Sequence, residues 1–151
     1  MSASAYQLPG ALGAVDAVVG AVSTVEYLLL ALLLVNMITR VLAHSRHVSE
    51  AADEVESLSR HPIHIASNVA LLLVSFYYTT LSQESGIVAT TLVLGLFITD
   101  FFEFEARNAE LRREVSLDAP KGAIGASLLA LLYIGYLSLF QFVEPIWTAI
   151  V

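Results

Sequence analysis

The stretch A-L-L-L-V-S-F-Y-Y-T-T-L-S-Q-E-S-G-I-V-A-T-T-L-V-L-G-L-F, residues 70–97, decides the fold. It contains two long apolar runs that only S-Q-E-S-G, residues 82–86, separates. Such runs are typical of helices that cross a lipid bilayer, whose ~30 Å hydrocarbon core needs about 20 helical residues. The short interruption predicts a tight antiparallel hairpin of two such helices, with Gly86 available for the turn.

The whole chain shares this apolar character. Its 151 residues are 57% hydrophobic and 14% charged, and its mean hydropathy is +0.75. Ordinary soluble domains contain only about 45–50% apolar residues. We therefore expect one membrane domain over residues 1–151, an all-α polytopic membrane protein folded as an antiparallel bundle of four transmembrane helices. The expected spans are residues 20–42, 63–81, 87–104 and 123–143, and the longer connections are residues 43–62 and 105–121.

The basic residues predict how the bundle is oriented. All seven lie in or beside the two longer connections: Arg40, Arg46, Arg60, Arg107, Arg112, Arg113 and Lys121. Connections rich in arginine and lysine stay in the cytoplasm. We therefore expect a multi-pass protein of the cell membrane, embedded in the lipid bilayer, with both longer connections cytoplasmic and both termini outside.

Composition excludes several classes of function. The chain has no cysteine, which rules out disulfides, thiolate metal sites and cysteine nucleophiles. Its net charge of −7 leaves no basic stripe for nucleic acid. There is no glycine-rich phosphate loop, no H-E-x-x-H and no nucleophile beside a base, so we do not expect an enzyme. The acidic, lysine-poor composition is typical of organisms with high internal salt.

Polar residues inside the spans predict contacts between helices. Arg40 on the first span and Asp100 on the third lie at similar depths from the cytoplasmic ends. Because a charge in hydrocarbon costs at least ~2.5–3.5 kcal/mol, we expect these two residues to form an ion pair. Asn36 and Asn68, one turn deeper, should bond between helices. Such groups usually fix packing, and a proton or ion path is the alternative.

Glu26 lies in the outer half of the first span, where no basic residue shares its depth. It must bond to a hydroxyl such as that of Ser75, Tyr78 or Tyr136, stay protonated, or face a partner subunit. A buried glutamate that titrates would suit a proton-coupled carrier.

Four histidines gather near the cytoplasmic side, and three interpretations of them stay open: a polar collar, a metal or haem site, and a pH sensor. The residues that could meet there are His44, His47, His61, His64, Asp100 and Glu103. Zinc accepts imidazole and carboxylate ligands, and haem b would need one histidine on each of two helices, which only His44 and His64 offer. His61 precedes Pro62, so we expect it to cap the second span rather than to act as a helical ligand.

Three segments carry a resemblance to a known group of proteins. They are E-Y-L-L-L-A-L-L-L-V-N-M-I-T-R (26–40), R-H-P-I-H-I-A-S-N (60–68) and L-D-A-P-K-G-A-I (117–124). Together they resemble a family of small, uncharacterised haloarchaeal four-helix membrane proteins. The resemblance implies an archaeal, halophilic source and brings no activity or site residues with it.

The expected function is that of a small structural or accessory membrane protein, which associates through its helices with itself or with a larger membrane complex. Small residues at four-residue spacing on the last span, Gly122, Ala126 and Ala130, would let a neighbouring helix approach closely. The alternatives are a haem- or metal-binding redox module that uses the histidines, and a proton-coupled carrier that uses Glu26.

Overall fold

Four helices make up the structure, a computed structural model that describes residues 7–151, with side chains from residue 13 onward except at residue 15. The helices are α1 (Gln7–Ala52), α2 (Pro62–Leu81), α3 (Gln83–Arg112) and α4 (Lys121–Ile150). The described residues form no strand. Each helix is long and apolar enough to cross a membrane, which confirms the expected all-α class with four candidate spans. The start of the expected domain, residues 1–6, lies outside the described residues.

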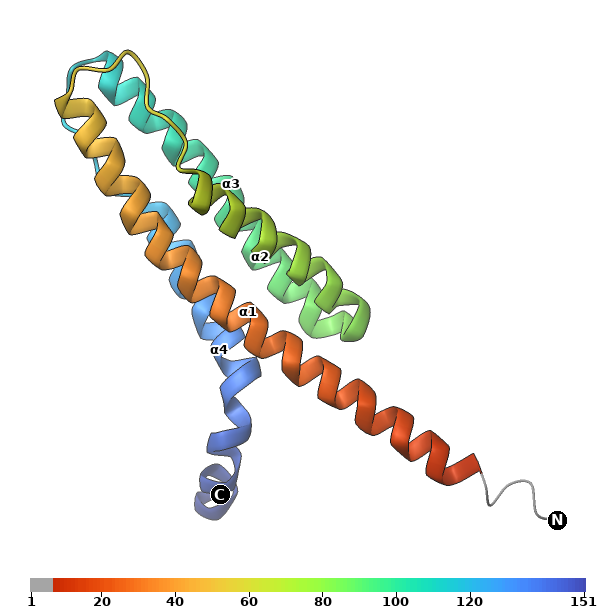
Figure 1. Cartoon of the computed structure of the whole chain (residues 1–151). Coiled ribbons are helices and arrows are strands. Elements are labelled where there is room, and N and C mark those ends of the chain that lie inside the picture. Colours follow the sequence, from red (N-terminus) through yellow and green to blue (C-terminus); the bar gives the residue numbers. More distant parts are fainter. Residues whose placement is uncertain (1–6) are drawn as a thin grey trace.

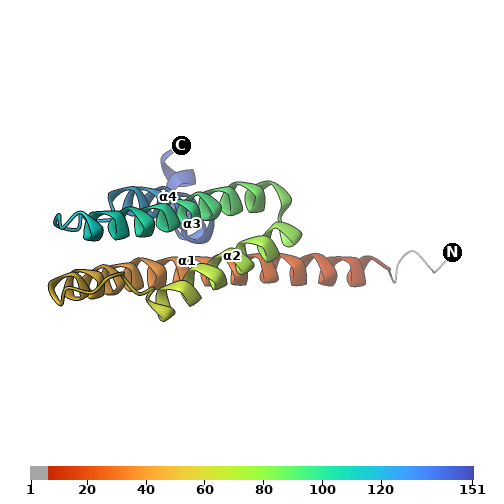
Figure 2. The ribbon, with the colours of Figure 1, turned by 90° about the horizontal axis from the view of Figure 1, so that it is seen from above.

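The helices form a closed ring of neighbours. α1 packs on α2, α2 on α3, α3 on α4, and α4 returns to α1. Figure 1 shows that successive helices run in opposite directions, and Figure 2 shows α1 and α2 in one layer with α3 and α4 in the other. Side chains such as Leu33, Leu71, Val93 and Ile134 fill the centre and are at most 1% exposed. Large apolar side chains also cover the outside, as a lipid-facing surface requires.

The turn between α2 and α3 is tighter than the sequence predicts. Only Ser82 separates the two helices. The expectation that Gly86 forms the turn is wrong, because Gly86 is helical and its φ is not positive. It is buried against α2 instead, where an added Cβ would collide with the backbone of Thr79, 2.8 Å from its nitrogen. Gly86 therefore allows the two helices to approach closely rather than letting the chain reverse.

α1 and α3 extend past the expected spans and end in the same way. Glu54 and Glu114, the second residue after each helix, have left-handed φ angles of 58° and 57°. In each case the next residue donates back to the helix, from Val55 N to the Glu50 carbonyl at 3.5 Å and from Val115 N to the Glu110 carbonyl at 3.2 Å. This is the hydrogen bond that closes a helix in the Schellman motif.

These matched helix ends set the register between α1 and α3. Glu54 and Glu114 are 60 residues apart, and so are Arg40 and Asp100. The hairpin α1–α2 is therefore followed by a second hairpin, α3–α4, with the same helix end in its first arm. In the ring of four helices, α1 and α3 face each other across the centre. Residues at equivalent positions of these two helices consequently meet at the same depth.

α4 continues through Pro145 to Ile150, beyond the expected end at residue 143. Proline has no N–H to offer the carbonyl of Gln141, and its ring crowds that turn. Figure 1 shows the end of α4 swinging away from α1.

At the other end of α4, Lys121 Nζ lies 3.3 Å from the Asp118 carboxylate. This hydrogen bond lowers the pKa of Asp118 from its ordinary value.

Candidate polar site between the helices

Arg40 and Asp100 form an ion pair at the centre of the bundle. Arg40 Nε lies 3.3 Å from Asp100 Oδ1, and the two residues are 3% and 9% exposed. This is the pair that the sequence predicts. The structural reason is that α1 and α3 run in the same direction and end alike, and Arg40 and Asp100 lie equally far before Glu54 and Glu114, so both side chains share one depth.

The remaining donors of Arg40 reach two further residues. Its Nη1 donates to Ser127 Oγ on α4 at 2.5 Å, and its Nη2 donates to Asn36 Oδ1, one turn away on α1, at 2.7 Å. The guanidinium is thus satisfied by α1, α3 and α4 together. A planar group with five fixed donors is suited to such a junction, because it can bond in several directions at once.

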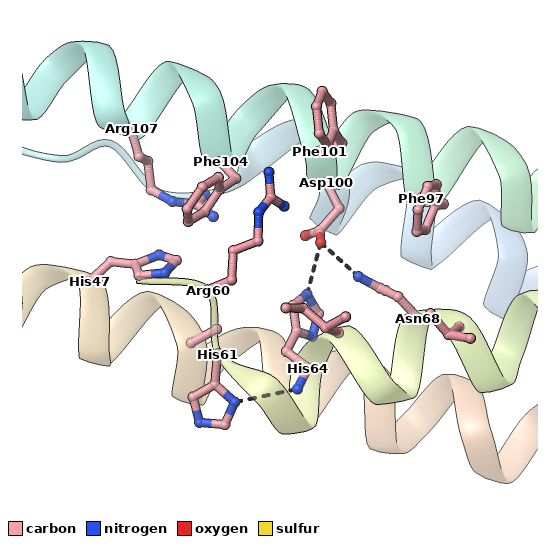
Figure 3. A pocket seen from close by; sticks show the side chains of 13 residues that line it. His47, Arg60, His61, His64, Asn68, Phe97, Asp100, Phe101, Phe104 and Arg107 are labelled. Carbon is pink, nitrogen blue, oxygen red and sulfur yellow. Dashed lines mark hydrogen bonds and ion pairs between the residues drawn. The ribbon is translucent and has the colours of Figure 1, made fainter. Parts of the chain in front are cut away.

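The carboxylate of Asp100 is also bonded by two side chains of α2. Its Oδ2 accepts a hydrogen bond from Asn68 Nδ2 at 2.9 Å and lies 3.0 Å from His64 Nε2. Figure 3 shows both interactions as dashed lines between α2 and α3. Asn36 Nδ2 also donates to Asn68 Oδ1 at 2.6 Å, which is the contact expected between these two asparagines. All four helices therefore contribute to one polar network.

His64 is held at both ring nitrogens. Its Nδ1 lies 2.9 Å from Thr39 Oγ1, while its Nε2 faces Asp100. His61 Nδ1 accepts a hydrogen bond from the His64 backbone N–H at 3.3 Å, so His61 caps α2 as the sequence predicts, with Pro62 first in the helix. Neither nitrogen of His64 is free for a ligand while these contacts hold.

Of the other two histidines, His47 lines the same cavity as His64 and His44 does not. His47 Nε2 bonds to the Ser59 carbonyl at 2.9 Å, and its ring is 2% exposed. His44 lines a groove between α1 and α4 beside Pro120, whereas His64 lines a cavity between α2 and α3. The structure thus does not bring His44 and His64 to a shared ligand position. The facing pair that haem b requires is not formed.

The expected zinc ligands are also not assembled. Within the part of the chain that the structure describes, no group of three or more histidine, aspartate or glutamate side chains could hold a metal ion. Glu103 turns to α4, where its Oε1 accepts a hydrogen bond from the Gly122 backbone N–H at 2.6 Å. It therefore serves the contact between α3 and α4 instead of joining the histidines.

The small residues of α4 do lie at helix contacts. A Cβ on Gly122 would come within 2.7 Å of Glu103 Oε1, so the glycine allows α3 to pass closely. Ala130 is fully buried, and Ala126 packs at the edge of the core. These residues are used inside the bundle.

Glu26 has the hydroxyl partner that the sequence suggests. Tyr78, which is fully buried on α2, donates from its hydroxyl to Glu26 Oε1 at 2.7 Å. The choice of Tyr78 over Ser75 and Tyr136 depends on how α1 and α2 are rotated.

A cavity of about 140 Å³ between α2 and α3 is a feature that sequence reasoning missed. Arg60 and Arg107 line it together with Phe101 and Phe104. From the sequence, the two arginines stand only among the basic residues that predict the orientation of the bundle. A signal was present in F-F-x-F, residues 101–104, because aromatic rings near basic residues provide cation–π surfaces.

The comparisons with known proteins place the chain in a family. The family described as a domain of unknown function (DUF7313) matches residues 5–151. The chain belongs to this family. No curated protein and no solved structure matches it. The family description assigns no activity, so the argument for function depends on the chain's own residues.

Proposed function

We propose that this member of the family is a multi-pass protein of the cell membrane with both termini outside and both longer connections in the cytoplasm. Figure 1 shows the α1–α2 and α3–α4 connections at the same end of the bundle, opposite the α2–α3 turn. All seven basic residues of the chain lie toward that end. The distribution of positive charge supports the cytoplasmic placement of these connections.

Within the membrane we propose a structural or accessory role, in which the helices associate with a second copy or with a larger membrane complex. The observation that carries this proposal is the outer part of α1. The Tyr78–Glu26 bond fixes the register, so that α2 ends close to the level of residue 22 on α1. α1 begins at Gln7 and therefore projects by about 15 residues, or ~22 Å, past the α2–α3 hairpin.

The described side chains of the projecting segment, at residues 13, 14 and 16–20, are all exposed, and all but Asp16 are apolar or glycine. Val18 and Val19 are 53% and 59% exposed. The end of α4 projects at the same end of the bundle, and its last residue, Val151, is 87% exposed. Figure 1 shows both segments standing clear of α2 and α3. Apolar side chains alone would face lipid, but the exposed small residues Gly13, Ala17 and Gly20 would let another membrane helix approach closely, which supports this role.

Single-cysteine variants test both parts of the proposal, because the native chain has no cysteine to interfere. Ser57→Cys and Ser116→Cys should react with a membrane-impermeant maleimide only in inverted vesicles, and Val151→Cys only in intact cells. The opposite pattern would overturn the orientation.

For association, Val19→Cys should give a disulfide-linked dimer in native membranes, or a photo-induced adduct with another membrane protein when a cross-linker is attached. Leu33→Cys, fully buried within the bundle, is the matched control and should give neither. If Val19→Cys remains monomeric in both assays, the accessory role is rejected.

A further inference from the structure

Arg107 is a buried arginine without a protein partner. It is 6% exposed. In the described part of the chain, no hydrogen bond or carboxylate contact within 4.0 Å reaches its guanidinium, and its Nε is fully enclosed. An isolated buried charge costs several kcal/mol, so a buried cation in a native protein has a counter-charge. In the described part of the chain no carboxylate within 4.0 Å supplies it, and Asp100, Glu103 and Glu110 act on the guanidinium only from further away.

The cavity that Arg107 lines is rich in basic groups. Arg60 reaches into it from the α1–α2 connection, with its guanidinium carbon 4.1 Å from the centre of the Phe104 ring. His47 also lines the cavity, but its Nε2–H donates to the Ser59 carbonyl, so its unpartnered Nδ1 is an acceptor and does not itself attract an anion. Figure 3 shows Arg60 and Arg107 reaching toward Phe104 from different elements. The like charges of the two arginines favour an anion between them.

The acidic residues nearby do not fill this need. Asp100 lines the same cavity, but its oxygens already face Arg40, His64 and Asn68. Glu105 meets Arg60 at 3.2 Å on the outside, where both side chains are at least 40% exposed. Glu103 and Glu110 of α3 act on Arg107 only from beyond ion-pair distance, and Glu103 Oε1 already accepts a hydrogen bond from Gly122. The Arg107 guanidinium therefore has no direct carboxylate partner.

The wall of the cavity shows what kind of anion fits. Its side opens between exposed apolar residues of α2 and α3, among them Ile65, Val69 and Phe101, which are 40–44% exposed. The basic groups lie at the connection end, at the level where α2 begins. An ionic group above an apolar opening is the pattern of a bilayer surface, and arginine forks match the oxygens of a phosphate.

We propose that this cavity, defined by Arg107 and Arg60, binds a phosphate group, supplied by a phospholipid headgroup or by a soluble phosphate. A phosphate held by Arg107 would satisfy the unpartnered guanidinium and separate it from Arg60. The cavity of about 140 Å³ has room for one such group. This site does not depend on whether the helices associate with a partner.

The test uses the full chain purified in detergent. Native mass spectrometry would measure retention of added phosphatidylglycerol against phosphatidylcholine, and equilibrium dialysis would measure binding of inorganic phosphate. Phosphatidylglycerol retained without inorganic phosphate identifies a lipid site, whereas binding of inorganic phosphate alone identifies a soluble ligand. Retention of both lipids indicates that the site recognises the phosphodiester and not the rest of the headgroup. Each of these results supports the phosphate site, and binding of none of the three probes overturns it.

Variants locate the binding. Arg107→Gln should weaken it tenfold or more, since hydrogen bonds to charged groups contribute ~1.5–3 kcal/mol. Arg112→Gln removes the same charge from an exposed position five residues further along α3 and should change affinity less than twofold. Equal losses in the two variants would overturn the site in favour of general surface charge. If Arg107→Gln fails to fold, Arg60→Gln, at an exposed residue, makes the same comparison.

Discussion

Neutralising Asp100 tests whether the central ion pair holds the bundle together. At the 3.3 Å separation of Arg40 Nε and Asp100 Oδ1, two unit charges attract by about 5 kcal/mol at an effective dielectric constant of about 20. The arginine side chain is only 4% exposed, so water cannot replace the lost carboxylate. We expect Asp100→Asn to lower the free energy of unfolding by about 3–5 kcal/mol, as breaking other buried pairs does.

A double-mutant cycle separates the pair from the rest of the network. Arg40→Met should also cost about 3–5 kcal/mol, because it leaves the aspartate charge unpaired. The double variant Arg40→Met/Asp100→Asn should cost at least ~2 kcal/mol less than the sum, since it buries no lone charge. Unfolding by SDS in mixed micelles, followed by far-UV circular dichroism, measures all three free energies.

The control is the exposed ion pair of Arg46 with Glu50, whose arginine side chain is 46% exposed. Arg46→Met should cost no more than about 1 kcal/mol, because surface pairs contribute little. If the single costs at the central pair add to the double cost within ~0.5 kcal/mol, the two charges do not interact and the reasoning is refuted.

Three further predictions concern single residues, each measured by the same SDS unfolding. Gly86→Ala should lower the free energy of unfolding by ~1–3 kcal/mol, because the added methyl group would be overpacked against α2. The control Gly95→Ala, where no atom lies within 4 Å, should raise it by up to ~1 kcal/mol. Equal effects of the two substitutions would contradict the close approach of α2 and α3 at Gly86. Glu54→Gly should stabilise by ~1 kcal/mol because glycine adopts a φ of 58° without strain, and a loss of stability would show that the side chain matters more. Tyr78→Phe should cost ~1.5–3 kcal/mol if Glu26 is ionised, and Glu26→Gln should reduce that cost; an unchanged cost would mean that the carboxyl is neutral.

Prediction from sequence succeeded where a single helix carries the information. Hydropathy along the chain predicts four long apolar helices, because each residue contributes to it whatever its neighbours are. The pairing of Arg40 with Asp100 could be predicted as well, since the rise of a helix is fixed and depth can be counted from the helix ends. His61 was likewise predictable as a cap, because Pro62 restricts the residue before it.

Prediction failed where two helices decide the outcome together. A residue's direction changes by 100° with each step along a helix, so a small rotation of α1 decides whether His44 faces α2 or α4. The sequence of α1 alone does not determine how far this helix is rotated about its axis. Gly86 illustrates a different error, because glycine suits both a turn and a close helix contact, and only the position of α2 distinguishes them.

The sequence by itself determined that four helices are long and apolar enough to cross a membrane, and at which end of the bundle positive charge gathers, because these properties depend on residue types and on distance along the chain. The tertiary structure alone decided which polar groups are satisfied and which are not. It gives Arg40 three partners and leaves Arg107 with none. The physical reason is that burial and hydrogen bonding of these side chains depend on which helices lie next to each other, and this is settled only when the helices pack.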